Sequence, residues 1–138
     1  MTRDVIDQAV QVRLIATAPD PHAVPAVLHY HPSDPLAVRI SFPPEISLDG
    51  GAVEWAFGRE LLAEGLRSPS GRGDVRVRPA GTDRTVLELY VPDGVAMVQL
   101  PTADVRRFLD RAYGAVPAGH ERRHLDVDRE LGELLGGG

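Results

Sequence analysis

The first half of the chain alternates between apolar and polar residues. Val10, Val12 and Leu14 are separated by Gln11 and Arg13, and this period of two is typical of a strand with one buried face. Three further runs have the composition of strands: AVPAVLHY (23–30), LAVRISF (36–42) and AVEWAF (52–57). The pattern therefore predicts four strands within residues 1–57.

At Arg59 the apolar period changes to that of a helix, and Gly65 and Pro69 provide the residues that end one. The apolar residues at helical spacing are Leu61, Leu62 and Leu66. The sequence predicts a short helix of about two turns, with these leucines facing the core.

The second half repeats the order of strands and a helix. Its strand-like runs are DVRVRP (74–79), TVLELY (85–90) and VAMVQL (95–100). A helix follows Pro101, with Thr102 as the predicted N-cap. Its apolar stripe consists of Val105, Phe108, Leu109, Ala112 and Tyr113. Gly114 and Pro117 end this helix, and a last helix is predicted from about residue 126 to residue 135.

The chain of 138 residues contains no segment that looks like a linker between domains. It is long enough to bury a core without disulfides or metals. The order of elements is strands, helix, strands, helix, helix. We therefore predict a single domain, residues 1–138, of the α+β class with mostly antiparallel strands.

The composition excludes several kinds of chemistry. The chain has no cysteine, which removes disulfides, thiol nucleophiles and cysteine-ligated zinc. All 15 basic residues are arginine, so there is no lysine for a Schiff base or a phosphate loop. The net charge of −5 argues against a general affinity for nucleic-acid backbones. Because neither a signal-peptide pattern nor an apolar run of membrane-spanning length occurs, we expect a cytoplasmic protein.

One short string, HERRH at residues 120–124, matches the zinc-protease motif H-E-x-x-H. A zinc protease needs both histidines on one face of a helix that lies beside a cleft. Here Pro117 and Gly119 precede the string, and two arginines fill its middle. We interpret it as a charged connector, and we expect neither a metal nor another cofactor.

Other candidates for catalysis are weaker. His29 and His31 share one face of a strand end, but no third metal ligand accompanies them. No serine or threonine has an evident base and orienting partner in the sequence. No catalytic residue is therefore assigned, and the chain is predicted not to be an enzyme.

Arginines around the fifth strand-like run leave a different class of function open. Arg76 and Arg78 alternate on one strand face, and Arg72 and Arg84 flank it. An antiparallel sheet with exposed arginines can follow a single nucleic-acid strand. Aromatic residues make up only 5% of the chain, which leaves few platforms for stacked bases. Binding of single-stranded DNA or RNA is therefore the alternative hypothesis.

The run VEWAFGRELLAEGLRSPSGRGDVRVRP, residues 53–79, resembles the SsgA-like proteins. These are regulators of sporulation-specific cell division in filamentous, spore-forming bacteria. The features that carry the resemblance are Val53-Glu54-Trp55, Arg59, Leu61 to Leu66, Gly71 to Gly73 and Asp74 to Val77. The resemblance extends over nearly the whole chain, through the helix after residue 101 and into the C-terminal tail.

The resemblance implies two antiparallel sheets, each followed by a helix, similar to the Whirly-type nucleic-acid binders and assembled as a homotrimer. It also implies a non-catalytic adaptor, recruited to division septa, that acts through protein contacts. The implied partner is the tubulin-like ring protein FtsZ or another SsgA-like protein. No cofactor is implied.

The short helix that begins at Arg59 is the predicted contact surface for such a partner. Its charged residues are Arg59, Glu60, Glu64 and Arg67. The core side of the helix is taken by leucines, which leaves Glu60, Glu64 and Arg67 facing outward or nearly so. Arginine is also enriched where interface energy concentrates. Trp55, in the preceding strand, is predicted to belong to the core.

Overall fold

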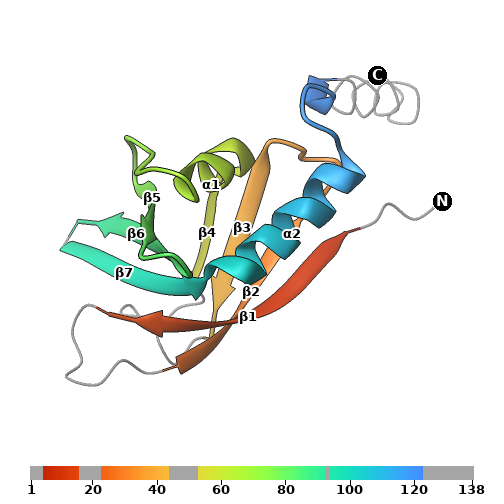
Figure 1. Cartoon of the computed structure of the whole chain (residues 1–138). Helices are drawn as coiled ribbons and strands as arrows, with labels where there is room; N and C mark the ends of the chain where they lie inside the picture. Colours follow the sequence, from red (N-terminus) through yellow and green to blue (C-terminus); the bar gives the residue numbers. More distant parts are fainter. Residues whose placement is uncertain (1–4, 16–22, 44–52, 93, 123–138) are drawn as a thin grey trace.

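The computed structural model describes residues 5–15, 23–43, 53–92 and 94–122. Within these ranges the elements follow one another along the chain as drawn in Figure 1. They are β1 (Ile6–Leu14), β2 (Ala23–Tyr30), β3 (Ala37–Phe42), β4 (Val53–Gly58), α1 (Arg59–Gly65), β5 (Val75–Ala80), β6 (Arg84–Val91), β7 (Gly94–Pro101) and α2 (Thr102–Ala115). The α+β class, the seven predicted strands and the first two predicted helices are confirmed. The helix predicted at residues 126–135 lies outside the described residues.

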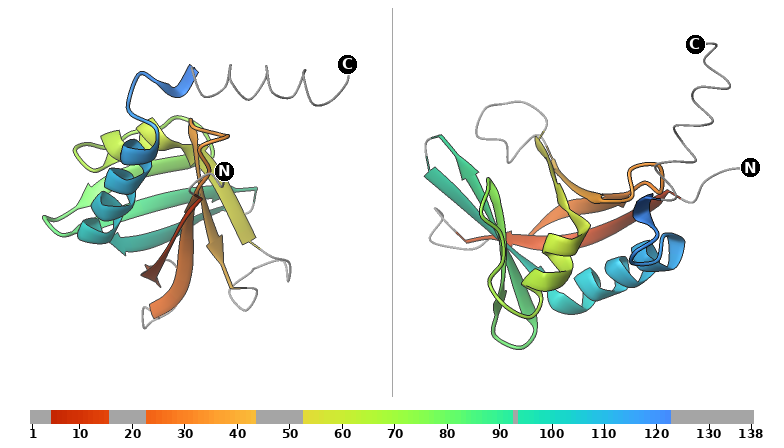
Figure 2. Two further views of the ribbon diagram at one scale, coloured as in Figure 1. Left: turned by 90° about the vertical axis from the view of Figure 1, so that its right-hand side faces the viewer. Right: turned by 90° about the horizontal axis from the view of Figure 1, so that it is seen from above.

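The strands form one antiparallel sheet, so the expectation of two separate sheets is not confirmed. The strand order is β4-β3-β2-β1-β7-β6-β5. The strand β1 joins the two halves, because it pairs with β2 along most of its length and with β7 at its end. The pairing with β7 involves only Arg13 opposite Gln99 and Leu14 opposite Val98. A junction this short allows the halves to turn relative to one another, as Figure 2 shows.

Both helices lie in the angle between the two halves of the sheet (Figure 2). The helix α1 contacts β4 and β5, and α2 contacts β1 and β7. The alternating apolar residues of the strands meet the helices there and form the core. Core residues with no exposed surface include Val12, Leu28, Val38, Ile40, Leu62, Val77, Leu87, Leu100, Val105 and Phe108. Trp55 is half-buried and packs against this core, as predicted.

The start of α2 differs from its predicted form. Pro101 occupies the N-cap position, and Thr102 is the first residue of the helix instead of its cap. The Oγ1 atom of Thr102 lies 2.8 Å from Oγ1 of Thr85 on β6, and both residues are buried. Thr102 therefore joins α2 to the sheet, because a buried hydroxyl needs a hydrogen-bond partner.

Candidate functional site

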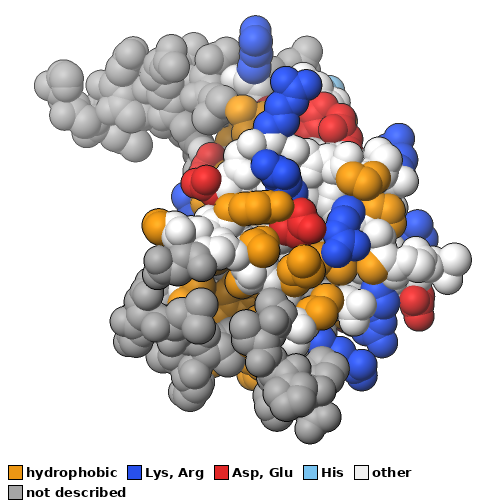
Figure 3. All heavy atoms as spheres, turned by 90° about the vertical axis from the view of Figure 1, so that its left-hand side faces the viewer, with side chains coloured by type: hydrophobic (Ala, Val, Ile, Leu, Met, Phe, Trp, Pro, Cys, Tyr) orange, Lys and Arg blue, Asp and Glu red, His pale blue; other side chains and the backbone are white. Residues whose placement is uncertain are grey.

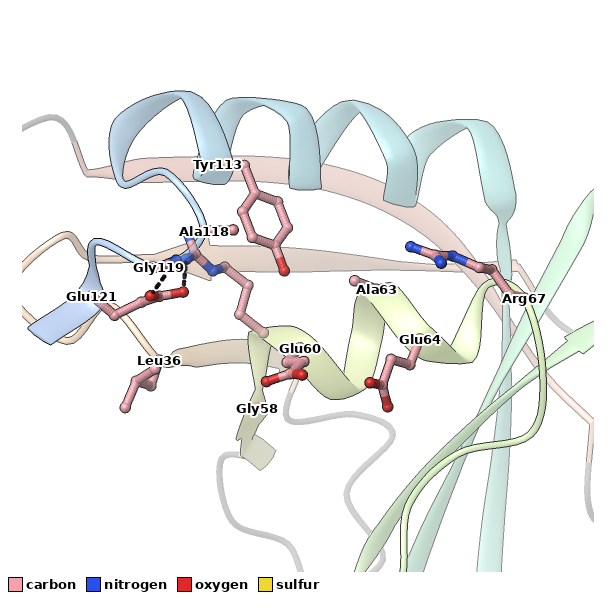
Figure 4. A pocket seen from close by; sticks show the side chains of 11 residues that line it. Leu36, Gly58, Glu60, Ala63, Glu64, Arg67, Tyr113, Ala118, Gly119 and Glu121 are labelled. Atoms are coloured by element: carbon pink, nitrogen blue, oxygen red, sulfur yellow. Dashed lines mark hydrogen bonds and ion pairs between the residues drawn. The ribbon is translucent and has the colours of Figure 1, made fainter.

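An open groove of about 680 Å³ lies where α1, the C-terminal end of α2 and the segment after α2 meet (Figure 4). All four residues of the predicted contact surface line it: Arg59, Glu60, Glu64 and Arg67. The structure thus brings together the residues that the sequence selected. It also adds residues that the sequence analysis did not select, among them Leu36, Tyr113 and Glu121.

Arg59, the first residue of the predicted contact surface, is buried and does not present its guanidinium to solvent. Only 2% of its surface is exposed. Its Nη1 atom lies 2.7 Å from the carbonyl oxygen of Val116, 3.1 Å from that of Ala112 and 3.1 Å from the hydroxyl of Tyr30. Its Nη2 atom donates to Oε1 of Glu121 at 2.7 Å. Arg59 therefore holds the floor of the groove together.

The end of α2 explains why an arginine is buried here. The last carbonyl groups of a helix lack partners within the helix, and they carry partial negative charge. The last turn of α2 contains no basic residue of its own. Arg59, from the first position of α1, donates to Ala112 and Val116 and supplies the missing cation. This contact fixes the orientation of α1 relative to α2.

Two tyrosines complete the surroundings of the Arg59 guanidinium. Its central carbon lies 4.0 Å from the ring centroid of Tyr113 and 5.3 Å from that of Tyr30. A guanidinium so close to an aromatic ring is stabilised by the negative face of the ring. Burial raises the pKa of both tyrosine hydroxyls above 10.0, so both are protonated at neutral pH. The Tyr30 hydroxyl in turn donates to the carbonyl of Pro35 at 3.0 Å, which ties the turn after β2 to the same cluster.

Glu121 belongs to the zinc-protease-like string, and the structure gives it a different role. Hydrogen bonds from its own backbone N–H and from that of Gly119, together with Arg59, lower the pKa of its carboxyl below 4.5. The carboxylate is thus an acceptor that closes the groove at one end (Figure 4). Within the described ranges, no three His, Cys, Asp or Glu side chains gather closely enough to hold a metal ion. The second histidine of the string, His124, lies outside these ranges.

The other charged residues of α1 are exposed, as the sequence predicted. Glu60 and Glu64 are one turn apart and lie side by side in Figure 4, and Arg67 follows at the end of the helix. In the described part of the chain, none of the three takes part in an ion pair. Leu36, at the edge of the groove, is 55% exposed. The groove therefore presents exposed acids next to an exposed apolar side chain.

Comparison with known proteins shows the family to which this chain belongs. Residues 24–121 match the family described as "Streptomyces sporulation and cell division protein, SsgA". The chain belongs to the SsgA family. The matched region contains every residue that lines the groove, from Leu36 to Glu121.

Relatives within the SsgA family match along nearly their whole length. The sporulation-specific cell division protein SsgB of Salinispora tropica is 47% identical over 133 residues, which cover 93% of this chain and 92% of that protein. SsgB of Streptomyces coelicolor is 42% identical over 130 residues and 90% of each chain. A crystal structure of an SsgA-like sporulation-specific cell division protein from Thermobifida fusca has a TM-score of 0.86 and 35% identity, and the match covers 97% of this chain and 98% of that one.

In this SsgA family member, hydrogen bonds across the sheet link an aspartate, a histidine and a serine in the order found in a catalytic triad. His29 Nδ1 lies 2.7 Å from Oδ1 of Asp7, and His29 Nε2 lies 2.8 Å from Oγ of Ser41. The sequence did not reveal these contacts, because the three residues lie on three different strands. Acyl transfer also needs donors aimed at the developing oxyanion, and the ladders on both sides of β3 occupy the backbone N–H groups around Ser41. We interpret these hydrogen bonds as a cross-strand contact between β1, β2 and β3.

The arginines of the alternative hypothesis are only partly available. Arg76 and Arg78 share the outer face of β5, as predicted, and Arg84 lies on the same face of β6. However, Arg78 Nε lies 3.2 Å from Oε2 of Glu88, and the Arg76 guanidinium stacks on Tyr90 with 4.6 Å to the ring centroid. Figure 3 shows the side on which β5, β6 and β7 lie, where blue side chains are separated by red and orange ones. Among the described residues on this face, the basic side chains therefore do not form a continuous stripe.

No helix in the described part of the chain is both long and apolar enough to cross a membrane.

Proposed function

We propose that this chain is a non-catalytic regulator of sporulation-specific cell division that binds a protein of the division machinery at the groove between α1 and α2. The names of its relatives support the process, because the matched proteins are sporulation-specific cell division proteins. The proposed partner is the ring protein FtsZ or another SsgA-like protein. The protein would act in the cytoplasm and be recruited to division septa.

One observation carries the choice of surface. The exposed charges of α1, Glu60 and Glu64, and Arg67 just after it line the same hollow as the exposed Leu36 and the half-buried Tyr113. Charges and apolar side chains gathered around a concave surface are typical of a protein-binding site. Arg59 supports this surface from below and is not part of the contact. The proposed non-catalytic role agrees with a site that offers contacts instead of a nucleophile.

The same proposal includes a homotrimer with a Whirly-like arrangement. The sheet has two edge strands, β4 and β5. An exposed edge offers unpaired N–H and C=O groups, and proteins cover or pair such edges. We expect subunits to pack through these edges, so sedimentation at micromolar concentration should show a species about three times the mass of the 14.9 kDa chain. A single species of monomer mass would contradict the trimer.

Charge reversal on α1 tests the proposed surface. We expect the variant Glu60→Lys with Glu64→Lys to lose regularly spaced septa when it replaces the natural copy in sporulating filaments. Its free energy of unfolding should change by less than about 1 kcal/mol, because both side chains are exposed. The measurements are septum spacing by fluorescence microscopy and urea denaturation of the purified chain.

The matched control is the variant Asp74→Lys with Asp83→Lys. It makes the same change in net charge at two exposed acids in turns away from the groove. Normal septa are expected for this control. If the α1 variant folds, assembles and still supports normal septa, the groove is not the contact surface.

A further inference from the structure

The groove continues along the seam between α1 and α2 as a second, smaller hollow of about 220 Å³. The two hollows share Ala63, Arg67 and Tyr113, so they form one trough. Figure 4 shows Tyr113 reaching from α2 toward α1, where Ala63 also lies. The trough is therefore longer than the groove alone and lies open to solvent along both helices.

Charge is distributed unevenly along the trough. One hollow contains Glu60 and Glu64, whereas only the other contains Arg106, and Arg67 lies where the two meet. All four side chains are exposed. Asp110, one turn after Arg106 on α2, reduces the positive charge at the second end without cancelling it. The trough thus has an acidic end and a basic end.

Apolar side chains lie beside Arg67 where the two hollows meet and continue into the second one. Ala63 and Tyr113 line both hollows, and Leu66 and Leu109 line the second one. Because the pKa of the Tyr113 hydroxyl is raised by burial, this ring carries no charge at neutral pH. An apolar side chain placed on this floor would be removed from water on both sides, by residues of two helices.

We propose that the trough binds a short segment of a partner protein in which an apolar side chain lies between a basic residue and an acidic residue. The basic residue pairs with Glu60 and Glu64, the apolar side chain packs on Ala63 and Tyr113, and the acidic residue pairs with the Arg67 and Arg106 end. This inference rests on the proposed function and adds the chemistry of the partner. Two helices that flank a hollow are a common receptor for such a segment.

The charges at the two ends of the trough contribute more to its specificity for a segment than to the affinity of binding. Opposite charges at both ends attract a mixed-charge segment, whereas a uniformly charged segment meets repulsion at one end. A nucleic-acid backbone meets the same repulsion at Glu60 and Glu64. A segment with the mixed pattern is therefore favoured over either uniform pattern, and salt should reduce this preference.

The experiment titrates the full chain with three fluorescent synthetic peptides that share a leucine-rich centre. One peptide has lysines at one end and glutamates at the other, one has lysines at both ends, and one has glutamates at both ends. We expect the mixed peptide to bind about fivefold more tightly than either uniform peptide by fluorescence anisotropy. In the Glu60→Lys, Glu64→Lys variant both ends are basic, so the preference should move to the peptide with glutamates at both ends. The Asp74→Lys, Asp83→Lys control should keep the wild-type preference.

Three results would overturn the proposal: no binding, equal binding of the three peptides, or an unchanged preference in the α1 variant. Tighter binding of a labelled single-stranded oligonucleotide than of the mixed peptide would also overturn it. The septum assay separates this failure from failure of the proposed function. If the α1 variant loses septa but the wild type shows no peptide preference, the groove remains the proposed contact surface and the proposed partner chemistry is rejected. If septa are normal but the expected peptide preference is observed, the trough binds such a segment and the proposed role of the groove in septation is rejected.

Discussion

Replacement of Arg59 by methionine is expected to lower the free energy of unfolding by about 3–5 kcal/mol, the cost of removing one partner from a buried ion pair. The change leaves the carbonyls of Ala112 and Val116 and the carboxylate of Glu121 without their donor. Urea denaturation followed by fluorescence of the single tryptophan measures it. The free energy of unfolding of Arg59→Lys should lie between those of the wild type and Arg59→Met. A lysine keeps the positive charge, but its ammonium group cannot donate to all these acceptors in the geometry of the guanidinium fork.

The control for this prediction is Arg67→Met, which removes an exposed arginine in the segment just after α1. It should change stability by less than about 0.5 kcal/mol. Similar denaturation midpoints for Arg59→Met and Arg67→Met would show that the buried cluster contributes little.

The pH dependence of stability checks the contacts of Glu121, whose carboxylate accepts from its own backbone N–H, from Arg59 and from the N–H of Gly119. The pKa of Glu121 is lowered in the folded chain, so its contribution to stability is present above pH 4.5 and is lost as pH falls through the lowered pKa. We therefore expect the stability difference between wild type and Glu121→Gln to shrink as pH falls below 4.5. A difference that stays constant across this window would argue against these contacts.

Local pattern was sufficient to predict the elements but not the way they join. The alternation in β1 and the leucine spacing in α1 are local patterns within each segment, so the strand and the helix could both be predicted. The single sheet depends on the pairing of β1 with β7, whose paired residues Arg13 and Gln99 are far apart in the sequence. Such pairing is decided by tertiary packing, which leaves no local signal. The two sheets that the family resemblance implied are therefore not confirmed, although each predicted strand is present.

The candidate site was predictable to a similar degree. Glu60, Glu64 and Arg67 were found because they lie on the polar side of an amphipathic segment. Arg59 was grouped with these residues, and its burial could not be anticipated because its acceptors at the end of α2 are more than fifty residues away. One signal was present in the sequence: the last turn of α2 has no basic residue, so a cation from elsewhere was needed there. Tyr113 was found as part of the apolar stripe, but nothing local shows that this end of the stripe lines a groove.

Two glycines near helix ends differ in whether close packing requires a glycine at that position. Gly65 and Gly114 both lie near helix ends, and both were interpreted as residues that end a helix. Neither has a positive φ, so neither needs glycine for its backbone conformation. They differ in what a side chain would meet. A Cβ atom on Gly114 would have no neighbour within 4 Å, whereas one on Gly65 would lie 2.2 Å from Cγ1 of Val77 on β5.

The same substitution should therefore have opposite effects at these two positions. Gly114→Ala is expected to raise the free energy of unfolding by about 0.5–1 kcal/mol, because alanine is the better helix former. Gly65→Ala should lower it by about 1–3 kcal/mol, because the clash with Val77 exceeds that gain. Adding Val77→Ala should restore only part of the loss, since the Cβ atom of residue 77 would remain 2.3 Å from the new methyl group. Urea denaturation of the three variants measures these changes in the free energy of unfolding. If Gly65→Ala is more stable than the wild type, α1 and β5 are not packed as closely as in this structure.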